Sequence, residues 1–184
     1  MAKSNNYFMV VDVQNLWYSC RHVYGPDFRV DFKGLLDFTL DHVLQGVDPV
    51  LNATAYLVVS SNHDQTNFIN ALRQLEFNIK KRSFYYNKSK PGPGVSWNVG
   101  ITADAFVQAD SYDKIILVSG DGDFTYLAEP LRELGKEVII LAFEDSLSKQ
   151  LSTAANEVFY IGRDSVYSPK QRFSTGQRDQ FVTD

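Results

Sequence analysis

The 184-residue sequence has a single cysteine, Cys20, and only three histidines, His22, His42 and His63. One cysteine cannot form an internal disulfide or supply the thiolates of a structural zinc site. The histidines lie about twenty residues apart and form no HExxH-like pair. A metal site in this chain would therefore have to be built from oxygen ligands, and such ligands select hard cations.

Long hydrophobic runs are also absent from the sequence. No apolar run approaches the ~20 residues that a helix needs to cross a bilayer. Only five apolar or aromatic residues, Tyr7 to Val11, directly precede Asp12, and this run is too short for the core of a signal peptide. We therefore expect a cytoplasmic protein that does not associate with membranes. The chain length and the 44% of hydrophobic residues favour one globular domain.

The chain is acidic, with a formal net charge of −4, which argues against non-specific binding to nucleic acid. One segment departs from this balance, because residues 80–90 include five basic residues and no acidic ones. We predict that this segment binds nucleic acid, with basic groups meeting phosphates and aromatic rings stacking on bases. The candidate residues are Lys80, Lys81, Arg82, Lys88, Lys90, Tyr86 and Trp97. The alternative is a solvated strand end with two aromatic rings in the core.

Strand-like and helix-like patterns alternate along the chain. Buried strands are predicted at residues 7–11, 53–59, 77–84, 114–119, 137–143 and 157–161. Helices are predicted at residues 31–45, 64–76, 98–109 and 146–154, with another that ends at residue 134. This alternation predicts an α/β fold with three layers, α/β/α, around a mostly parallel central sheet.

The domain itself is predicted to span residues 1–161. Residues 162–184 are polar and show no clear periodicity, so we expect a tail that is partly disordered or lies over the surface. The sequence from Lys90 to Gly94 is rich in proline and glycine and predicts a loop. Pro130 falls inside a predicted helix and should kink it.

Acidic residues follow two of the predicted strands directly. Asp12 ends the first strand, and Asp121 and Asp123 follow the strand at residues 114–119. Functional sites of parallel sheets lie beyond the carboxyl ends of the strands, so these three carboxylates are expected to meet if the two strands are neighbours. Carboxylates at such a short distance repel each other, and a divalent cation such as Mg²⁺ or Mn²⁺ relieves the repulsion. Taken singly, each aspartate is also explained by a turn or a helix cap.

Two motifs resemble those of a known family. Residues 10–15, with the sequence VVDVQN, resemble the opening D-x-x-N motif of NYN domains, a branch of the PIN-like nucleases that includes the bacterial LabA-like proteins. Residues 117–124, LVSGDGDF, resemble their S-G-D-S-D-F motif. Residues 131–138 and 146–161 resemble the segments that follow. The resemblance covers roughly residues 7–161.

The resemblance implies a PIN-like fold and a metal-dependent phosphodiesterase that usually acts on RNA, with Mg²⁺ or Mn²⁺ as cofactor. Asp12 and Asp121 would be the first metal ligands, and Asp123 would hold the metal or a water bound to it. Asn15 would fix the loop around Asp12 or donate a hydrogen bond to a phosphate. The full set of implied site residues is Asp12, Asp104, Asp121 and Asp123 as catalytic groups and metal ligands, Asn98 as a further ligand, and Asn15 and Ser119 as support.

The sequence departs from the family pattern at the start of the helix predicted at residues 98–109. LabA-type domains usually carry a lysine and then an acid there, and the matching positions are Val95 and Asn98. An amide oxygen can coordinate a hard cation without neutralising its charge. Two hypotheses therefore stand: a metal-dependent ribonuclease, or a catalytically weakened NYN-like module that binds nucleic acid or a protein partner. A homodimer is left open.

A phosphatase of the haloacid dehalogenase type is a weaker alternative. Such enzymes also place an aspartate after the first strand and a glycine-aspartate loop later in the chain. Their chemistry needs a second acid two residues after the first aspartate, and that position holds Gln14. Neither a nucleophilic serine or cysteine triad nor a histidine base is indicated by the sequence.

Overall fold

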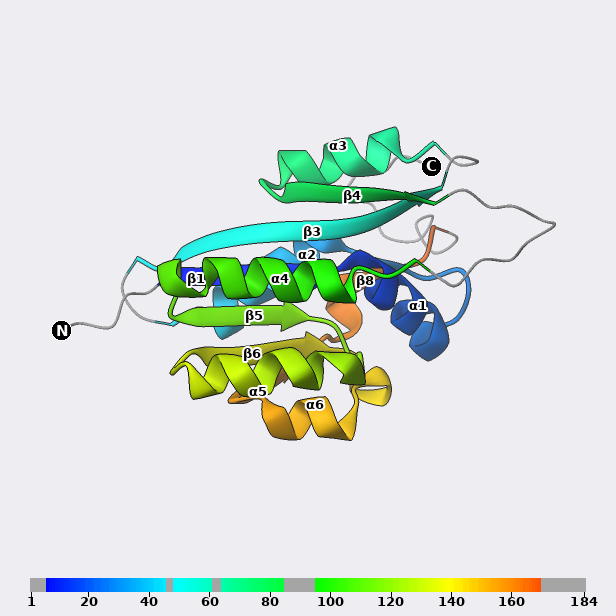
Figure 1. Cartoon of the computed structure of the whole chain (residues 1–184). Coiled ribbons are helices and arrows are strands. Elements are labelled where there is room, and N and C mark those ends of the chain that lie inside the picture. The colour runs from blue at the N-terminus through cyan, green and yellow to red at the C-terminus, as the bar shows by residue number, and fades with distance from the viewer. Residues whose placement is uncertain (1–5, 46–47, 61–63, 85–94, 170–184) are drawn as a thin grey trace.

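A six-stranded sheet forms the centre of the molecule in the computed structural model, which describes residues 6–45, 48–60, 64–84 and 95–169. The strand order is β4-β3-β1-β5-β6-β7, and every neighbouring pair is parallel. Helices cover both faces of the sheet (Figure 1). The predicted three-layer α/β/α fold is confirmed. The strands are β1 Asn6–Asp12, β3 Val50–Ser60, β4 Asn78–Phe84, β5 Lys114–Val118, β6 Glu137–Ala142 and β7 Glu157–Tyr160.

The helices follow the predicted alternation closely, with differences at their ends. The α-helices are α1 Val13–Tyr24, α2 Phe32–Phe38, α3 Thr66–Gln74, α4 Asn98–Gln108, α5 Thr125–Glu133 and α6 Lys149–Ala154. A π-helical turn, η1 Thr39–Val43, continues α2, and short 3₁₀ turns are η2 Ala109–Ser111, η3 Gly122–Phe124, η4 Glu144–Ser146 and η5 Arg163–Ser165. Helix α5 runs through Pro130 to its end. None of the helices in the described ranges is long and apolar enough to cross a membrane.

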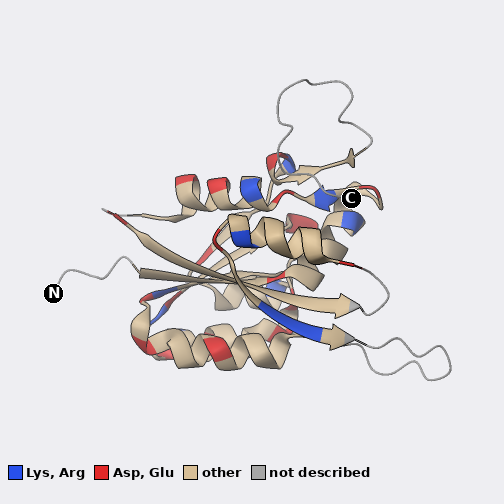
Figure 2. Ribbon diagram, turned by 90° about the horizontal axis from the view of Figure 1, so that it is seen from above, with Lys and Arg blue, Asp and Glu red and all other residues tan. Residues whose placement is uncertain are grey.

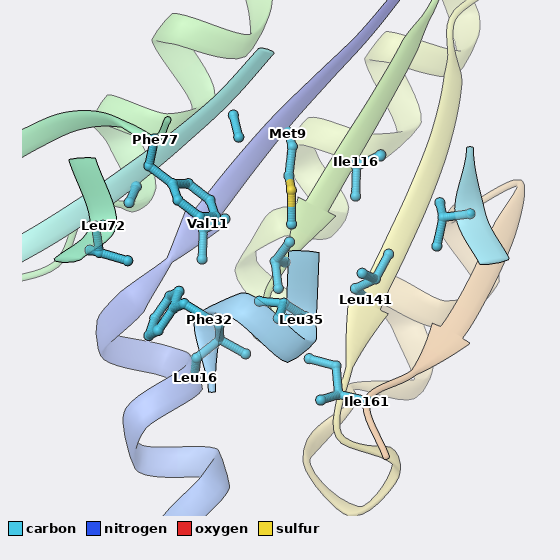
Figure 3. Close-up of a cluster of buried hydrophobic side chains, with 14 of the residues drawn as sticks. Met9, Val11, Leu16, Phe32, Leu35, Leu72, Phe77, Ile116, Leu141 and Ile161 are labelled. Carbon is cyan, nitrogen blue, oxygen red and sulfur yellow. The ribbon is translucent and has the colours of Figure 1, made fainter. Parts of the chain in front are cut away.

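Two hydrophobic cores lie on the two faces of the sheet. Successive side chains of a strand point to opposite faces, so β1 sends Met9 and Val11 into one core and Phe8 and Val10 into the other. The first core also contains residues of α1, α2 and α3, and Figure 3 shows part of it around Leu35. The second core contains residues of α4, α5 and α6. Because β1 is buried on both faces, it reads as a continuous apolar run.

The strand order fixes where a functional site can form. From β1 the chain builds outward through β3 and β4, and α4 then carries it back to β5 on the other side of β1. The direction of winding therefore reverses between β1 and β5. In open α/β sheets, ligands bind beyond the carboxyl ends of the strands at such a reversal. The residues that follow β1 and β5 lie at this place.

Helix α1 was not among the predicted elements. It begins directly after Asp12, whose side chain accepts a hydrogen bond from the backbone N–H of Asn15 at 3.0 Å and so caps the helix. Leu16 and Cys20, four residues apart, are buried against the sheet. This spacing is typical of an amphipathic helix. The pattern was therefore present in the sequence, although the prediction passed from the first strand directly to residue 31.

The beginning of the predicted tail is packed into the domain. Strand β8, Val166–Tyr167, pairs antiparallel with the short strand β2, Arg29–Val30. The backbone N–H of Asp31 also donates to the carbonyl of Ser165 at 2.9 Å. Ser165 and Val166 are buried by this arrangement. The predicted tail from residue 170 onward lies outside the described residues.

We expect Val166→Ala to lower the free energy of unfolding by about 1–2 kcal/mol, because it removes buried methyl groups and leaves a small void. Val166 is 5% exposed, whereas Val107, on the outer side of α4, is 76% exposed. The matched control Val107→Ala should change stability by less than about 0.5 kcal/mol. Urea denaturation of both variants measures the difference. Equal stabilities would show that the segment around Val166 does not contribute to the fold.

Candidate functional site

Asp12 is a buried carboxylate at the carboxyl end of β1. Its side chain is only 5% exposed. Burial raises the pKa of Asp12 from its ordinary 3.8 to about 6; the negative charge of Asp121 adds to this rise, and backbone N–H bonds from Asn15 and Gln14 oppose it. Asp121 therefore lies close enough for its charge to act on Asp12. As sequence analysis expected, the residues after β1 and β5 come together.

The loops that follow β1, β5 and β6 are tied to one another by hydrogen bonds. The side-chain oxygen of Asn15 accepts the backbone N–H of Gly120 at 3.1 Å, across 105 residues of sequence. The hydroxyl of Ser119 accepts the N–H of Asp121 at 3.3 Å, and the N–H of Ser148 donates to the carbonyl of Gly120 at 3.0 Å. Asn15 and Ser119 thus hold the Asp121 loop in place. Their support of a catalytic site stays a prediction.

Gly120 occupies a position where a side chain does not fit. A Cβ atom built there would clash with the backbone carbonyl group of Ser146, and backbone cannot move aside cheaply. A Cβ atom on Gly122 would come within 2.8 Å of the hydroxyl oxygen of Ser148, a side chain that can rotate away. The first glycine is therefore required for the close approach of the loops after β5 and β6.

Asn98, the first residue of α4, contacts both acids of the β5 loop. Its side-chain amide donates to Asp121 at 2.9 Å and more weakly to Asp123 at 3.5 Å. A second oxygen of Asp121 accepts the backbone N–H of Asp123 at 3.0 Å. The amide supplies N–H donors where the family pattern has an acid, so it relieves part of the repulsion between neighbouring carboxylates.

Asp104 is held by different partners. It lies six residues after Asn98 on α4, which is about 9 Å further along the helix axis. The hydroxyl of Tyr56 donates to it at 2.8 Å, and the ammonium group of Lys80 forms an ion pair with the same oxygen at 2.5 Å. Burial raises the pKa of Tyr56, and its bond to Asp104 raises it further. Asp104 therefore joins α4 to the sheet through β3 and β4.

Within the described part of the chain, no group of three or more Asp, Glu, His or Cys side chains is gathered closely enough to hold a metal ion. The residues that sequence analysis named divide into two sets. Asp12, Asp121, Asp123 and Asn98 surround the ends of β1 and β5, whereas Asp104 belongs to the ion pair with Lys80.

The basic stretch on β4 is shared between two faces of the sheet, and Figure 2 shows its positive charges on the strand. Lys80 and Arg82 lie on the α4 side, where Arg82 donates to the carbonyl of Ser96 at 3.2 Å. Lys81 alternates with them and points to the other face. All three are exposed. The remaining predicted nucleic-acid contacts, Tyr86, Lys88 and Lys90, lie outside the described residues.

Trp97 packs against strand β3 of the sheet and does not project into solvent. Its indole N–H donates to the carbonyl of Leu57 at 2.8 Å, and its ring meets Tyr56 edge to face at 5.4 Å between centroids. A Cβ on Gly100 would collide with the indole ring, so this glycine in α4 makes room for Trp97. The tryptophan fixes the start of α4, and with it the position of Asn98.

Tyr56, the buried partner of Asp104, was not among the predicted site residues. Tyr56 lies beside Asp12 in the register of β1 and β3, and beside Lys80 in the register of β3 and β4. No local pattern marks it, because a tyrosine in an apolar strand reads as a core residue. Its role follows only from the pairing of strands that are distant in sequence.

The family model of the NYN domain matches residues 8–162. The chain belongs to the NYN domain family. NYN domains are generally nucleases, so this chain is a nuclease-like module. The match includes every site residue named above, from Asp12 to the Ser148 loop.

The chain is also similar to two other known proteins. One is the Low amplitude and bright protein LabA of Synechococcus elongatus, 25% identical over 124 residues that cover 65% of this chain and 66% of the relative. The match thus spans just under two thirds of that protein. The other is a solved structure of a protein of unknown function from Vibrio parahaemolyticus, with a TM-score of 0.77 and 28% identity. That match covers 91% of this chain and 99% of the Vibrio protein.

In metal-free buffer, wild type should lose stability relative to Asp12→Asn as the pH rises from about 4 to about 6. The folded chain holds the Asp12 proton up to a pKa of about 6, whereas the unfolded chain releases it near 3.8. The difference should reach about 2–3 kcal/mol and stay constant at higher pH. Urea denaturation in EDTA across this range measures it, with Asp110→Asn as the exposed control. A parallel pH dependence of wild type and Asp12→Asn would contradict a raised pKa of Asp12 in the folded chain.

Proposed function

We propose that this NYN domain is a metal-dependent ribonuclease that hydrolyses phosphodiester bonds at the carboxyl ends of β1 and β5. The observation that carries the proposal is the pairing of Asp12 with Asp121 at the reversal of strand order. Burial and the nearby charge of Asp121 both disfavour the charged form of Asp12 there. A bound cation would remove this penalty.

The residues present fit Mg²⁺ or Mn²⁺. Mg²⁺ is commonly held by one or two carboxylates and otherwise by water and substrate phosphates. Asp12 and Asp121 would provide the two carboxylates, and Asn98 could turn its amide oxygen toward the ion. A site completed by the substrate needs no third protein carboxylate, so the pair is sufficient.

When bound, the cation would supply positive charge that stabilises the transition state and makes an attacking water more acidic. The chain's own residues would do the rest. Asp12 and Asp121 would bind the cation, and Asn15 and Ser119 would keep the Asp121 loop in position. The exposed carboxylate of Asp123 would orient the attacking water. The fixed positions of these side chains matter because groups that are ordered before the reaction add less entropy cost to its activation barrier.

Basic residues on β4 support a nucleic-acid substrate. Strand β4 lies two strands from β1, a distance of about 10 Å. Arg82 pairs in register with Val58, two residues beyond Tyr56, which is level with Asp12. Arg82 therefore lies past the end of β1 on the same edge of the sheet. A strand bound at the acids could reach it with a neighbouring phosphate.

A binding module without catalysis is the second candidate. The observation that favours it is Asn98, an amide that donates hydrogen bonds into Asp121 and Asp123 where the family pattern has an acid. Such a site would have lower affinity for a cation. Nucleic acid could then bind without being cut.

We expect cleavage of labelled single-stranded RNA in Mn²⁺ or Mg²⁺, its loss in EDTA, and a fall of at least about 100-fold in Asp121→Asn, since a metal ligand is removed. Asp110→Asn, an exposed substitution of the same kind, should cleave like wild type. Single-stranded DNA of the same sequence tests the preference for RNA. Equal inertness of wild type and Asp121→Asn, with RNA still bound, would leave the binding module as the function.

Asn98→Asp should change stability in opposite directions with and without metal. In EDTA it places a third carboxylate next to Asp121 and should lower the free energy of unfolding by about 1 kcal/mol or more. In Mn²⁺ the same carboxylate should tighten metal binding and raise the melting temperature and the cleavage rate. Thermal melts in both buffers measure the two signs. A variant destabilised equally in both would argue against a cation at this place.

A further inference from the structure

We propose that a cavity between α1 and α3 binds one unpaired base of the nucleic-acid strand. The inference rests on the proposed function, because it assigns the substrate's base to a place next to the acids. It goes further by making the substrate single-stranded at this position and by giving the pocket a preference among bases.

The cavity has a volume of about 530 Å³, within the range of small-molecule sites. It lies on the face of the sheet opposite α4. Its lining includes Val13 and Gln14, the two residues that follow Asp12, and Leu57 and Val58 near the end of β3. The cavity therefore begins one residue from the buried carboxylate, so a strand whose phosphate lies at Asp12 can place an adjoining base in it.

Aromatic rings form part of the cavity wall. Trp17 and Tyr18, on the first turns of α1, line it and are 40% and 59% exposed. The guanidinium of Arg21 packs on the Trp17 ring at 4.4 Å and the Tyr18 ring meets it edge to face, so the indole is held in place. Exposed, fixed rings are the surfaces on which bases of single strands stack.

Amide side chains line the same cavity, at Gln14, Gln65 and Asn67. The side-chain oxygen of Gln65 is buried and has no hydrogen-bond partner among the described residues. A buried acceptor without a donor is unfavourable. Rotation of the Gln65 amide toward the cavity would let a ligand that donates a hydrogen bond pair with this oxygen. Exocyclic amino groups of bases are such donors; cytosine presents one where uracil presents a carbonyl.

The charges around the cavity favour a base over a phosphate. Arg29 and Asp64 line it together, so the two charges offset each other. The guanidinium of Arg29 already donates to the carbonyls of Pro26 and Phe28, both at 2.9 Å. The described residues that line the cavity therefore carry no net positive charge for a phosphate. A neutral planar ring with polar edges matches aromatic walls and amides better.

Binding of fluorescently labelled oligocytidylate and oligouridylate to the full chain in EDTA, where cleavage is blocked, tests the inference by fluorescence anisotropy. Trp17→Ala should weaken binding of both by about tenfold through lost stacking, and Trp17→Phe should restore most of it. Wild type should prefer oligocytidylate by several-fold, and Gln65→Met should remove that preference. The control is Tyr126→Ala, which removes an exposed ring on α5, away from the cavity lining.

Cleavage of the same oligonucleotides in Mn²⁺ separates this inference from the proposed function. If wild type cleaves and the Trp17 and Gln65 variants bind as wild type does, the base pocket is wrong and the nuclease stands. If binding depends on Trp17 and Gln65 while wild type does not cleave, the pocket stands and the nuclease is wrong. Loss of affinity in Trp17→Ala without any preference for cytosine would overturn the role of Gln65.

Discussion

The carboxylates of Asp12 and Asp121 lie close together where β1 and β5 end, and burial gives Asp12 little water to offset the nearby charge. The surrounding structure works to hold this unfavourable pair in place. Asn15 accepts a hydrogen bond from Gly120, Ser148 donates one to the same residue, and Asn98 donates to Asp121. These bonds keep the charge of Asp121 near Asp12, where it adds to the rise that burial causes in the pKa of Asp12.

The part of the site that sequence analysis predicted depends on short-range rules. Acids that follow strands in a parallel α/β sheet come to the same edge, which gave Asp12 and Asp121. The fold class followed from alternating strand and helix patterns for the same reason, because periodicity is a local property.

The part that was not predicted depends on pairing between distant segments. Asp104 shares the helix of Asn98, yet a rise of about 9 Å and the neighbouring Tyr56 and Lys80 give it other partners. Lys80 was predicted to contact nucleic acid because it lies in a run of basic residues. In the structure, the register of β4 against β3 places Lys80 beside Asp104, with which it forms an ion pair. The cavity beside α1 was not predicted, because helix α1, which forms part of its wall, was not predicted either.

The bond between Asn15 and Gly120 has a consequence for protein synthesis. It joins segments 105 residues apart, and β5, which brings Gly120 to Asn15, is made after β1, β3 and β4. Contacts between such distant residues form late, because a long loop must close first. A nascent chain that ends before residue 114 carries Asp12 without Asp121 beside it. The paired acids therefore exist only after most of the domain has left the ribosome, so an incomplete chain lacks this part of the candidate site.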